Sequence, residues 1–179
     1  HALYKFPRTI ERGTTLTYQV NFHASRNTIE SGYIDNRLGV YVALQVAETI
    51  KDGVIVFSSW EEHGGGSGPY LAKYIYEKWQ IKQALIADIT WISDGVLPMK
   101  GVAISVRDRN IPRRAYINRV IEVARRRKVD FQLEVEGMGS SDGRELQASP
   151  YPFDWCFVGA PQQYPHTAKE KVYKHDMKS

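Results

Sequence analysis

The stretch VIVFSSWEEHGGGSGPYLA, residues 54–72, joins a short apolar run to a polar loop and to the start of a helical pattern. Residues 54–57 are apolar throughout, as expected of a buried strand. The loop carries the adjacent acids Glu61 and Glu62 and a cluster of glycines, and helical spacing begins at residue 70 and continues to residue 79. A strand, a loop and a helix in this order predict one unit of an α/β fold.

Strand-like and helical segments alternate along the rest of the chain. Strand patterns cover residues 15–22, 84–89, 101–106, 131–135 and 155–158. Helical patterns cover residues 36–50, 113–128 and 144–148, and the polar residues 23–31 are expected to form a loop. This alternation predicts a three-layer αβα sandwich built on a mostly parallel mixed sheet.

Length and composition predict a single domain over residues 1–179. The chain has 179 residues, of which 42% are hydrophobic, which is enough for one sizeable core and too little for two full domains. Its 24 basic and 20 acidic residues give a net charge of +4, with basic runs such as residues 125–128. Such runs are typical of solvated helix ends, and because no nucleic-acid motif accompanies them, nucleic-acid binding is not expected.

Cysteine content and hydropathy restrict the chemistry and the location of the protein. Cys156 is the only cysteine, so neither a disulfide framework nor a thiolate metal site can form, and a metal would need histidines and carboxylates. No apolar run approaches the ~20 residues of a membrane helix, and the N-terminal residues lack the apolar core of a secretory signal. We therefore expect a cytoplasmic protein without a membrane partner.

Polar residues gather just after the predicted strands, where ligands bind in open α/β sheets. An Asp35 on its own would usually be a helix cap, and isolated histidines usually lie on the surface. Asp88 is more informative, because it interrupts the apolar strand ALIADI at residues 84–89, and a buried charge needs a partner such as a cation. The residues collected in this way are His23, Asp35, Glu61, Glu62, Asp88, Asp142 and His166.

Five motifs in register resemble the co-catalytic zinc aminopeptidases, which include bacterial leucyl and glutamyl aminopeptidases and the tetrahedral aminopeptidases. Residues 54–72 resemble their strand and Glu-Glu-x-Gly loop, and IDNRLGVYVAL, residues 34–44, resembles their Asp-Asn-Arg-x-Gly helix start. The other three motifs are ALIADI, GSSDG at residues 139–143 and YPHTAKEKV at residues 164–172. Each motif alone is weak, but their shared order over nearly the whole chain is specific.

The resemblance implies a peptidase with two divalent metal ions, zinc in the first place and cobalt or manganese as substitutes. Asp35 would bridge the ions, with Glu62 and His166 completing one site, and His23 and Asp88 completing the other. Glu61 would be the general base that activates water for attack on a peptide substrate. The expected activity is removal of N-terminal residues, with endopeptidase, carboxypeptidase and amidase action left open.

Two features depart from the family's pattern. Where the family has His-x-Asp, this chain has His23-Ala24-Ser25, so the imidazole lacks an acidic partner and a one-metal enzyme is an alternative. Only 11 residues, 24 to 34, separate His23 from Asp35, so the lid domain that the tetrahedral enzymes insert there does not fit. A homo-oligomer is compatible with the resemblance, but the family's dodecamer is not assumed.

Two other functions compete with the metallopeptidase. A serine hydrolase of the α/β-hydrolase type would use Ser141, Asp154 and His166, which occur in triad order, although only 24 residues lie between Ser141 and His166. A catalytically inactive binding relative is the other alternative, and the retained Glu61 argues against it. Residues 64–66, all glycine, either let the backbone approach a substrate or form a flexible turn.

Overall fold

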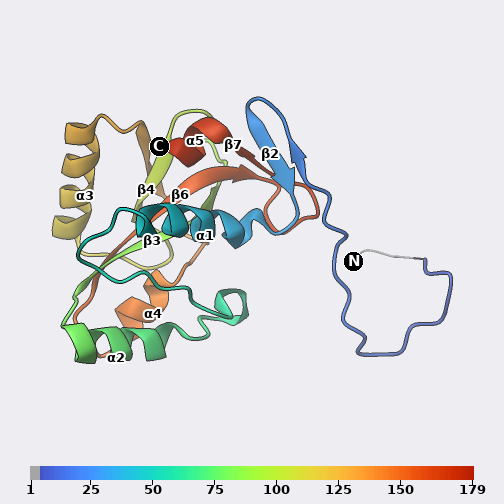
Figure 1. Cartoon of the computed structure of the whole chain (residues 1–179), viewed down its shortest axis with the longest axis horizontal. Coiled ribbons are helices and arrows are strands. Elements are labelled where there is room, and N and C mark those ends of the chain that lie inside the picture. Colours follow the sequence, from blue (N-terminus) through green and yellow to red (C-terminus); the bar gives the residue numbers. More distant parts are fainter. Residues whose placement is uncertain (1–4) are drawn as a thin grey trace.

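The computed structural model describes residues 5–179, in which seven strands form one sheet and helices pack around it (Figure 1). The strands are β1 (His23–Ala24), β2 (Thr28–Ser31), β3 (Gln83–Trp91), β4 (Val102–Arg107), β5 (Phe131–Val135), β6 (Asp154–Gln163) and β7 (Glu170–Tyr173). The helices are α1 (Ile34–Ala47), α2 (Gly68–Trp79), α3 (Arg114–Arg127), α4 (Gly143–Ala148) and α5 (Lys174–Lys178), with a 3₁₀ turn, η1, at Glu61–His63. Within this part of the chain, no helix is both long and apolar enough to cross a membrane.

The sheet is mixed, and the prediction that it is mostly parallel is wrong. Among the described residues, four of the six strand pairings are antiparallel, and only β3–β6 and β4–β5 are parallel. A parallel pair needs a long crossover, which α3 provides between β4 and β5. Three of the antiparallel pairings involve the short strands β1, β2 and β7, which the sequence pattern does not predict. The loop predicted for residues 23–31 is wrong, because β1 and β2 pair with each other there.

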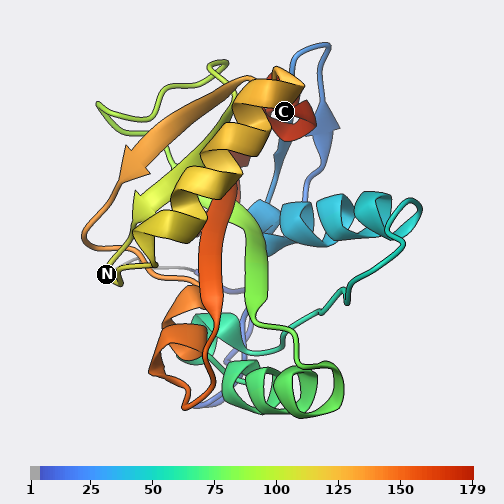
Figure 2. The same cartoon turned by 90° about the vertical axis from the view of Figure 1, so that its left-hand side faces the viewer.

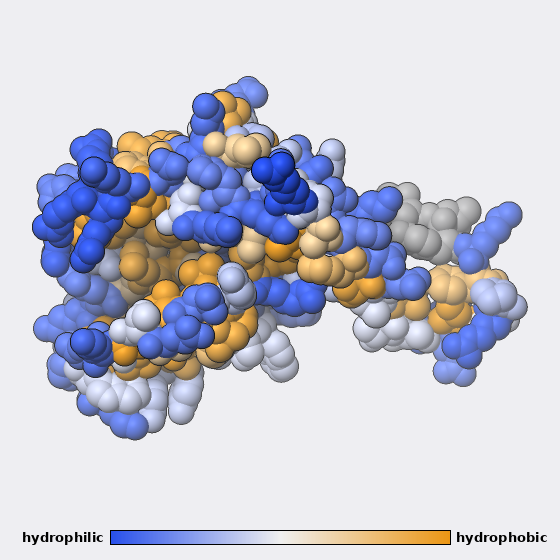
Figure 3. All heavy atoms as spheres, turned by 45° about the horizontal axis from the view of Figure 1, so that its top comes forward, coloured by the Kyte–Doolittle hydropathy of each residue, from blue (hydrophilic) through white to orange (hydrophobic). Residues whose placement is uncertain are grey.

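The predicted strands at residues 15–22 and 54–57 are wrong, because in the part of the chain that the structure describes neither segment pairs with a strand. Residues 54–57 run outside the sheet, and Phe57 is 51% exposed. Residues 15–22 lie on the segment that projects from the body in Figure 1, and Leu16 and Phe22 are among its exposed apolar side chains. Figure 3 shows hydrophobic residues, in orange, on this projecting part of the molecule. An alternating or apolar pattern favours an extended backbone, but a strand also needs a neighbour to bond with.

The other predicted elements are confirmed with shifts of a few residues at their ends. In α3, the apolar stripe that includes Ile117 and Ile121 packs on Cys156 and Val158 of β6 and on neighbouring strands, and Figure 2 shows this helix lying across the sheet. A second cluster joins α1 to β3, β6 and β7. The opposite face of β6 presents Trp155 to α4, so helices contact both faces of this central strand.

Close contact between α1 and β3 fixes the place of the residues that follow. A side chain at Gly39 would come within 2.1 Å of the Ala87 carbonyl oxygen, so only glycine lets the helix approach the strand this closely. Asn36 completes the contact, because its Nδ2 donates to the Ala87 carbonyl at 2.9 Å and its Oδ1 accepts from the Gly39 amide at 2.7 Å. The first turn of α1 is therefore fixed against the strand residue that precedes Asp88.

Candidate metal centre

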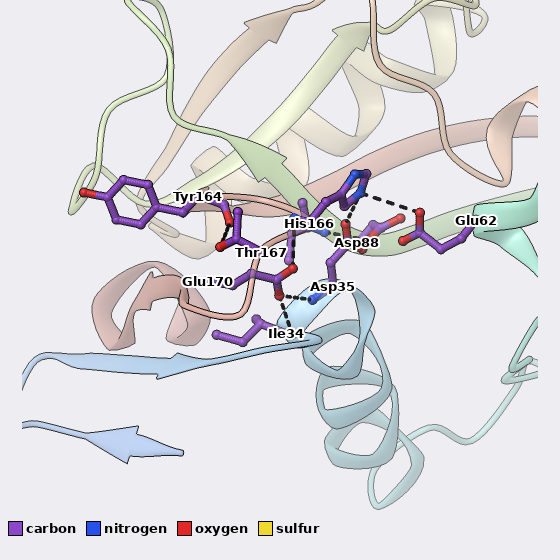
Figure 4. Close-up of polar contacts among 9 residues, drawn as sticks. Ile34, Asp35, Glu62, Asp88, Tyr164, His166, Thr167 and Glu170 are labelled. Carbon is purple, nitrogen blue, oxygen red and sulfur yellow. Dashed lines mark hydrogen bonds and ion pairs between the residues drawn. The ribbon is translucent and has the colours of Figure 1, made fainter. Parts of the chain in front are cut away.

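Three side chains from separate parts of the chain converge at one end of the sheet (Figure 4). His166 Nε2 lies 3.1 Å from Asp35 Oδ2 and 3.5 Å from Glu62 Oε2, and one ligand atom from each residue lies within 4.8 Å of the others. Asp35 is the most buried of the three, with 10% of its side chain exposed, against 52% for Glu62 and 59% for His166. Asp35 is therefore enclosed by the protein, whereas the side chains of Glu62 and His166 face solvent.

The backbone conformation around these residues is unusual. Tyr33, Trp60 and His166 all have positive φ, of 59°, 65° and 58°, although none is glycine. Tyr33 lies immediately before α1 and Trp60 immediately before Glu61, and His166 is itself one of the three converging residues. Non-glycine residues in the left-handed region are uncommon and cluster at functional sites, where the surrounding structure maintains them.

The carboxylate of Glu170 holds two of the three segments together. Its Oε2 accepts the backbone N–H groups of Ile34 at 2.5 Å and Asp35 at 3.1 Å, and its Oε1 accepts that of His166 at 3.0 Å. Glu170 is 2% exposed and belongs to β7, a strand that is itself part of the sheet. The sheet therefore fixes the spacing between Asp35 and His166 through this one buried side chain.

Two further acids, Glu61 and Asp88, line the same pocket. Burial, together with the charges of Glu62 and Asp142, raises the pKa of Glu61 to about 7. Burial and the neighbouring charge of Glu62 raise the pKa of Asp35 to about 6, and burial with the charge of Asp35 raises the pKa of Asp88 well above its usual range. Each carboxylate is crowded by others, which disfavours its charged form.

A divalent cation would relieve this crowding, and the donors present suit one. Asp35, Glu62 and His166 supply two carboxylates and an imidazole, a mixture that favours zinc and accommodates cobalt or manganese. Asp88 adds a third carboxylate to this set. The geometry thus fits one metal ion at the convergent three, and it offers Asp35 and Asp88 to a second.

The structure does not bring His23 into this group. His23 begins β1 at the edge of the sheet, where it pairs with Glu30 of β2, and its side chain is exposed. It does not line the pocket that holds the other four predicted ligands and Glu61. The sequence interpretation required a strand before His23 that would end at the site, but residues 15–22 leave the sheet and carry the histidine to its edge.

The serine hydrolase triad is not assembled either. Ser141 and His166 line the same pocket, but Asp154 lies at the opposite end of β6, where its Oδ2 pairs with Arg113 Nη2 at 2.5 Å. The imidazole of His166 instead faces Asp35 and Glu62. Without a carboxylate to orient the histidine toward Ser141, the arrangement lacks the third group of such a triad.

Glycines in the loop before α2 serve to pack that loop. A side chain at Gly65 would meet the carboxyl group of Glu145 at 2.2 Å, and one at Gly66 would meet the Ser59 carbonyl at 1.9 Å. Both residues have positive φ. The loop that carries Glu61 and Glu62 therefore turns tightly against its own preceding segment and against α4.

The sequence pattern assigns no role to three acids of this region. One of them, Glu170, lies within the segment YPHTAKEKV, residues 164–172. Glu134 and Asp108 line the pocket beyond the convergent residues. The signal for Glu134 was the one that identified Asp88, a charged residue inside a strand of otherwise mostly apolar side chains, FQLEV at residues 131–135.

Comparison with known proteins gives a family and a fold. The family described as M42 glutamyl aminopeptidase matches residues 7–179, and no protein of curated function matches the chain. An aminopeptidase from the archaeon Desulfurococcus kamchatkensis is similar in structure, with a TM-score of 0.78 and 22% identity over 89% of this chain and 48% of its own. A TET aminopeptidase from a marine-sediment Thaumarchaeota archaeon has a TM-score of 0.78 and 16% identity over 89% of this chain and 49% of its own.

A third similar structure is a TET peptidase of Pyrococcus horikoshii that can assemble into a tetrahedron or a large octahedral shell. Its TM-score is 0.66, with 16% identity over 90% of this chain and 50% of that chain. At these identities the solved structures show the shared fold. The chain spans about half the length of these relatives.

Proposed function

Because this chain belongs to the M42 glutamyl aminopeptidase family, we propose that it is a metal-dependent aminopeptidase that removes N-terminal residues from peptides. The observation that supports this proposal most strongly is the convergence of Asp35, Glu62 and His166 within 4.8 Å, with Glu61 in the same pocket. The family match covers residues 7–179, and the three converging side chains come from three separate segments within that range.

Asp35, Glu62 and His166 would hold a divalent ion, zinc in the first place, and Asp35 and Asp88 would take part in holding a second. Such an ion supplies Lewis acidity and lowers the pKa of water toward neutrality. Glu61 is the general base in this proposal, since it lies beside a ligand residue but outside the convergent set. Its carboxylate accepts a proton from the attacking water and returns one to the leaving amine.

The position of each group is controlled by the protein rather than by the ion alone. Glu170 fixes the backbone that carries Asp35 and His166, and Asn36 fixes the first turn of α1 against β3. Burial and crowding disfavour the charged form of Asp88, and an incoming cation would relieve this, so the centre favours a cation over neutral occupants. Preorganised ligands of this kind need little rearrangement when an ion arrives.

Hydrolysis of aminoacyl chromogenic substrates with and without a chelator tests the proposal. We expect turnover that is lost on chelation and restored by zinc, cobalt or manganese. Turnover that survives chelation but falls to a serine-directed inhibitor would contradict it. Metal binding at the centre without any turnover would identify the chain as a binding relative. Assembly into homo-oligomers stays a prediction, which light scattering of the purified protein checks.

A further inference from the structure

The pocket extends beyond the metal centre into a region lined by acids that have no role in the proposed function. The pocket has a volume of about 260 Å³, far more than the ~30 Å³ share of one water molecule. Beyond the convergent residues, its lining includes Thr90 from β3, Asp108 just after β4, and Glu134 from β5. We refer to the region formed by these three residues as the acidic floor.

In β5 the charged residue Glu134 is buried while its apolar neighbours are exposed, which is the reverse of the usual arrangement in a strand. It is 4% exposed, while its neighbours Leu133 and Val135 are 43% and 73% exposed. The hydroxyl of Thr90 donates to its Oε1. In the described chain no Lys, Arg or His side chain pairs with Glu134, although burying a carboxylate is costly without a cationic partner.

Asp108 carries a buried acceptor without a partner. The residue is 5% exposed, and its Oδ1 accepts the backbone N–H and the side-chain amide of Asn110 at 2.5 and 3.1 Å. Its Oδ2 has no hydrogen-bond partner among the described residues. Buried polar atoms in proteins are nearly always paired, so this oxygen, which lies in a pocket, is available to a donor from outside the protein.

The charge of the pocket lining indicates which kind of group would donate to Asp108 Oδ2. The lining holds seven Asp and Glu residues, one histidine, and no lysine or arginine. The nearest cation, Arg107, donates through Nε to the backbone carbonyl of Asp108 and does not line the pocket. An anionic group would be repelled by this lining, and a neutral one would leave the floor uncompensated, whereas a cation would be attracted.

We propose that the acidic floor formed by Asp108, Glu134 and Thr90 receives the positively charged side chain of a lysine or arginine at the N-terminus of the substrate. This assignment rests on the proposed aminopeptidase function, because it places the first residue of a peptide next to the metal centre. An ammonium has three donors and no acceptor, so it matches a site that offers carboxylate oxygens and no donor partner for Asp108 Oδ2.

Burial raises the pKa of both Glu134 and Asp108, and an incoming cation would favour their charged forms. Glu136 also lines this pocket, but its carboxylate is already hydrogen-bonded within the protein. It accepts the backbone N–H groups of the next three residues, Gly137, Met138 and Gly139. Both carboxylate oxygens of Glu136 thus accept from the backbone, whereas Oδ2 of Asp108 has no partner among the described residues. The basic specificity assigned here differs from the glutamyl specificity in the description of the family.

The first test compares lysyl with norleucyl chromogenic substrates on the zinc-supplemented protein, since norleucine has the lysine chain without its terminal ammonium. We expect kcat/KM to favour lysine by roughly 10- to 100-fold, as for other desolvated charge pairs. Arginyl substrates should also be preferred over norleucyl ones, and glutamyl substrates should be the poorest. Equal or better hydrolysis of norleucyl or glutamyl substrates would overturn the assignment.

Variants of the floor residues test whether these residues cause the preference for lysine. Glu134→Gln and Asp108→Asn should each reduce the lysine-to-norleucine ratio of kcat/KM by roughly 10-fold. Glu122→Gln, an exposed residue of α3 with the same change of charge, serves as the matched control and should keep the full ratio. If Glu134→Gln fails to fold by circular dichroism, Asp108→Asn decides. An unchanged ratio in a folded variant of either floor residue would contradict the proposal.

Equilibrium binding separates this inference from the proposed function. Lysinamide and norleucinamide are titrated into the zinc-supplemented protein by calorimetry, which needs no turnover. If no aminoacyl substrate is hydrolysed but lysinamide binds roughly 10-fold tighter than norleucinamide, the proposed activity fails and the acidic floor stands. If aminoacyl substrates are hydrolysed and the two amides bind equally, the acidic floor fails and the activity stands.

Discussion

The carboxylate of Glu170 accepts the backbone N–H of His166 at 3.0 Å, and through its other oxygen it accepts the N–H groups of the segment that carries Asp35. Glu170 therefore positions two of the candidate metal ligands although it is not itself a ligand. Outer groups that orient ligands typically change metal affinity by 10- to 100-fold when they are removed. This relationship gives the first prediction.

Glu170→Ala should weaken zinc binding by roughly 10- to 100-fold, although no ligand is changed. It leaves one buried and two partly buried backbone N–H groups without an acceptor, so the free energy of unfolding should also fall by roughly 3 kcal/mol. Calorimetric titration with zinc and chemical denaturation measure the two effects. Glu30→Gln, whose carboxylate pairs with Lys171, is the control, and wild-type zinc affinity in Glu170→Ala would contradict the positioning role.

Glu61 and Glu62 are neighbours with different expected roles. Glu61→Gln should retain bound zinc and lower kcat by at least roughly 100-fold, because it removes a general base that is not a ligand. Glu62→Gln should lose zinc, because it removes one of the three convergent ligands. Elemental analysis and turnover are measured on both variants. The assignment is wrong if the two patterns are exchanged.

Substitution of His23 should have no effect on the metal. The residue lies exposed on β1 and outside the pocket, so His23→Ala is expected to keep wild-type zinc affinity and stoichiometry. His166→Ala is the matched comparison, since it removes an imidazole that lies 3.1 Å from Asp35. Calorimetric titration distinguishes the two variants, and a loss of zinc in His23→Ala would show that this histidine reaches the centre after all.

The stability of the metal-free protein should fall as the pH rises toward neutrality. The pKa of Asp35 rises from 3.8 to about 6 and that of Glu61 from 4.5 to about 7, so between pH 3.8 and about 7 the folded chain holds protons that the unfolded chain releases. The free energy of unfolding then decreases with pH across this window.

Denaturation in the presence of a chelator, at several pH values, measures this slope. Glu61→Gln removes one of the titrating groups, so its slope should be smaller than that of the wild type. Glu122→Gln has the same loss of charge on an exposed surface and should keep the wild-type slope. Identical slopes for the wild type and Glu61→Gln would show that Glu61 is not crowded by its neighbours.

The sequence predicted the long helices and the central strands because their patterns repeat over many residues. The apolar stripe of α3 and the buried run of β3 are examples, and both were found within a few residues of the predicted bounds. β2 and β7 have four residues each, too few for a period to show. Since these short strands supply antiparallel pairings, missing them also led to the wrong sheet type.

For the site, the sequence brought out the acids at strand ends but could not say which strand ends meet. Asp35, Glu62 and His166 converge in the folded chain, whereas His23 follows a segment that lies outside the sheet. Glu170 escaped notice because its role depends on backbone N–H groups that come together only in the folded chain. Contacts of this kind leave no periodic signal in the sequence.

The position of bound zinc tests the central claim most directly. Crystals of the protein grown with zinc should show, at the zinc absorption edge, an anomalous peak within bonding distance of Asp35, Glu62 and His166, at ~2.0–2.2 Å from their oxygen and nitrogen atoms. A second peak between Asp35 and Asp88 would indicate a two-metal centre. Zinc bound elsewhere, or no peak at the three residues at saturating zinc, would contradict the account.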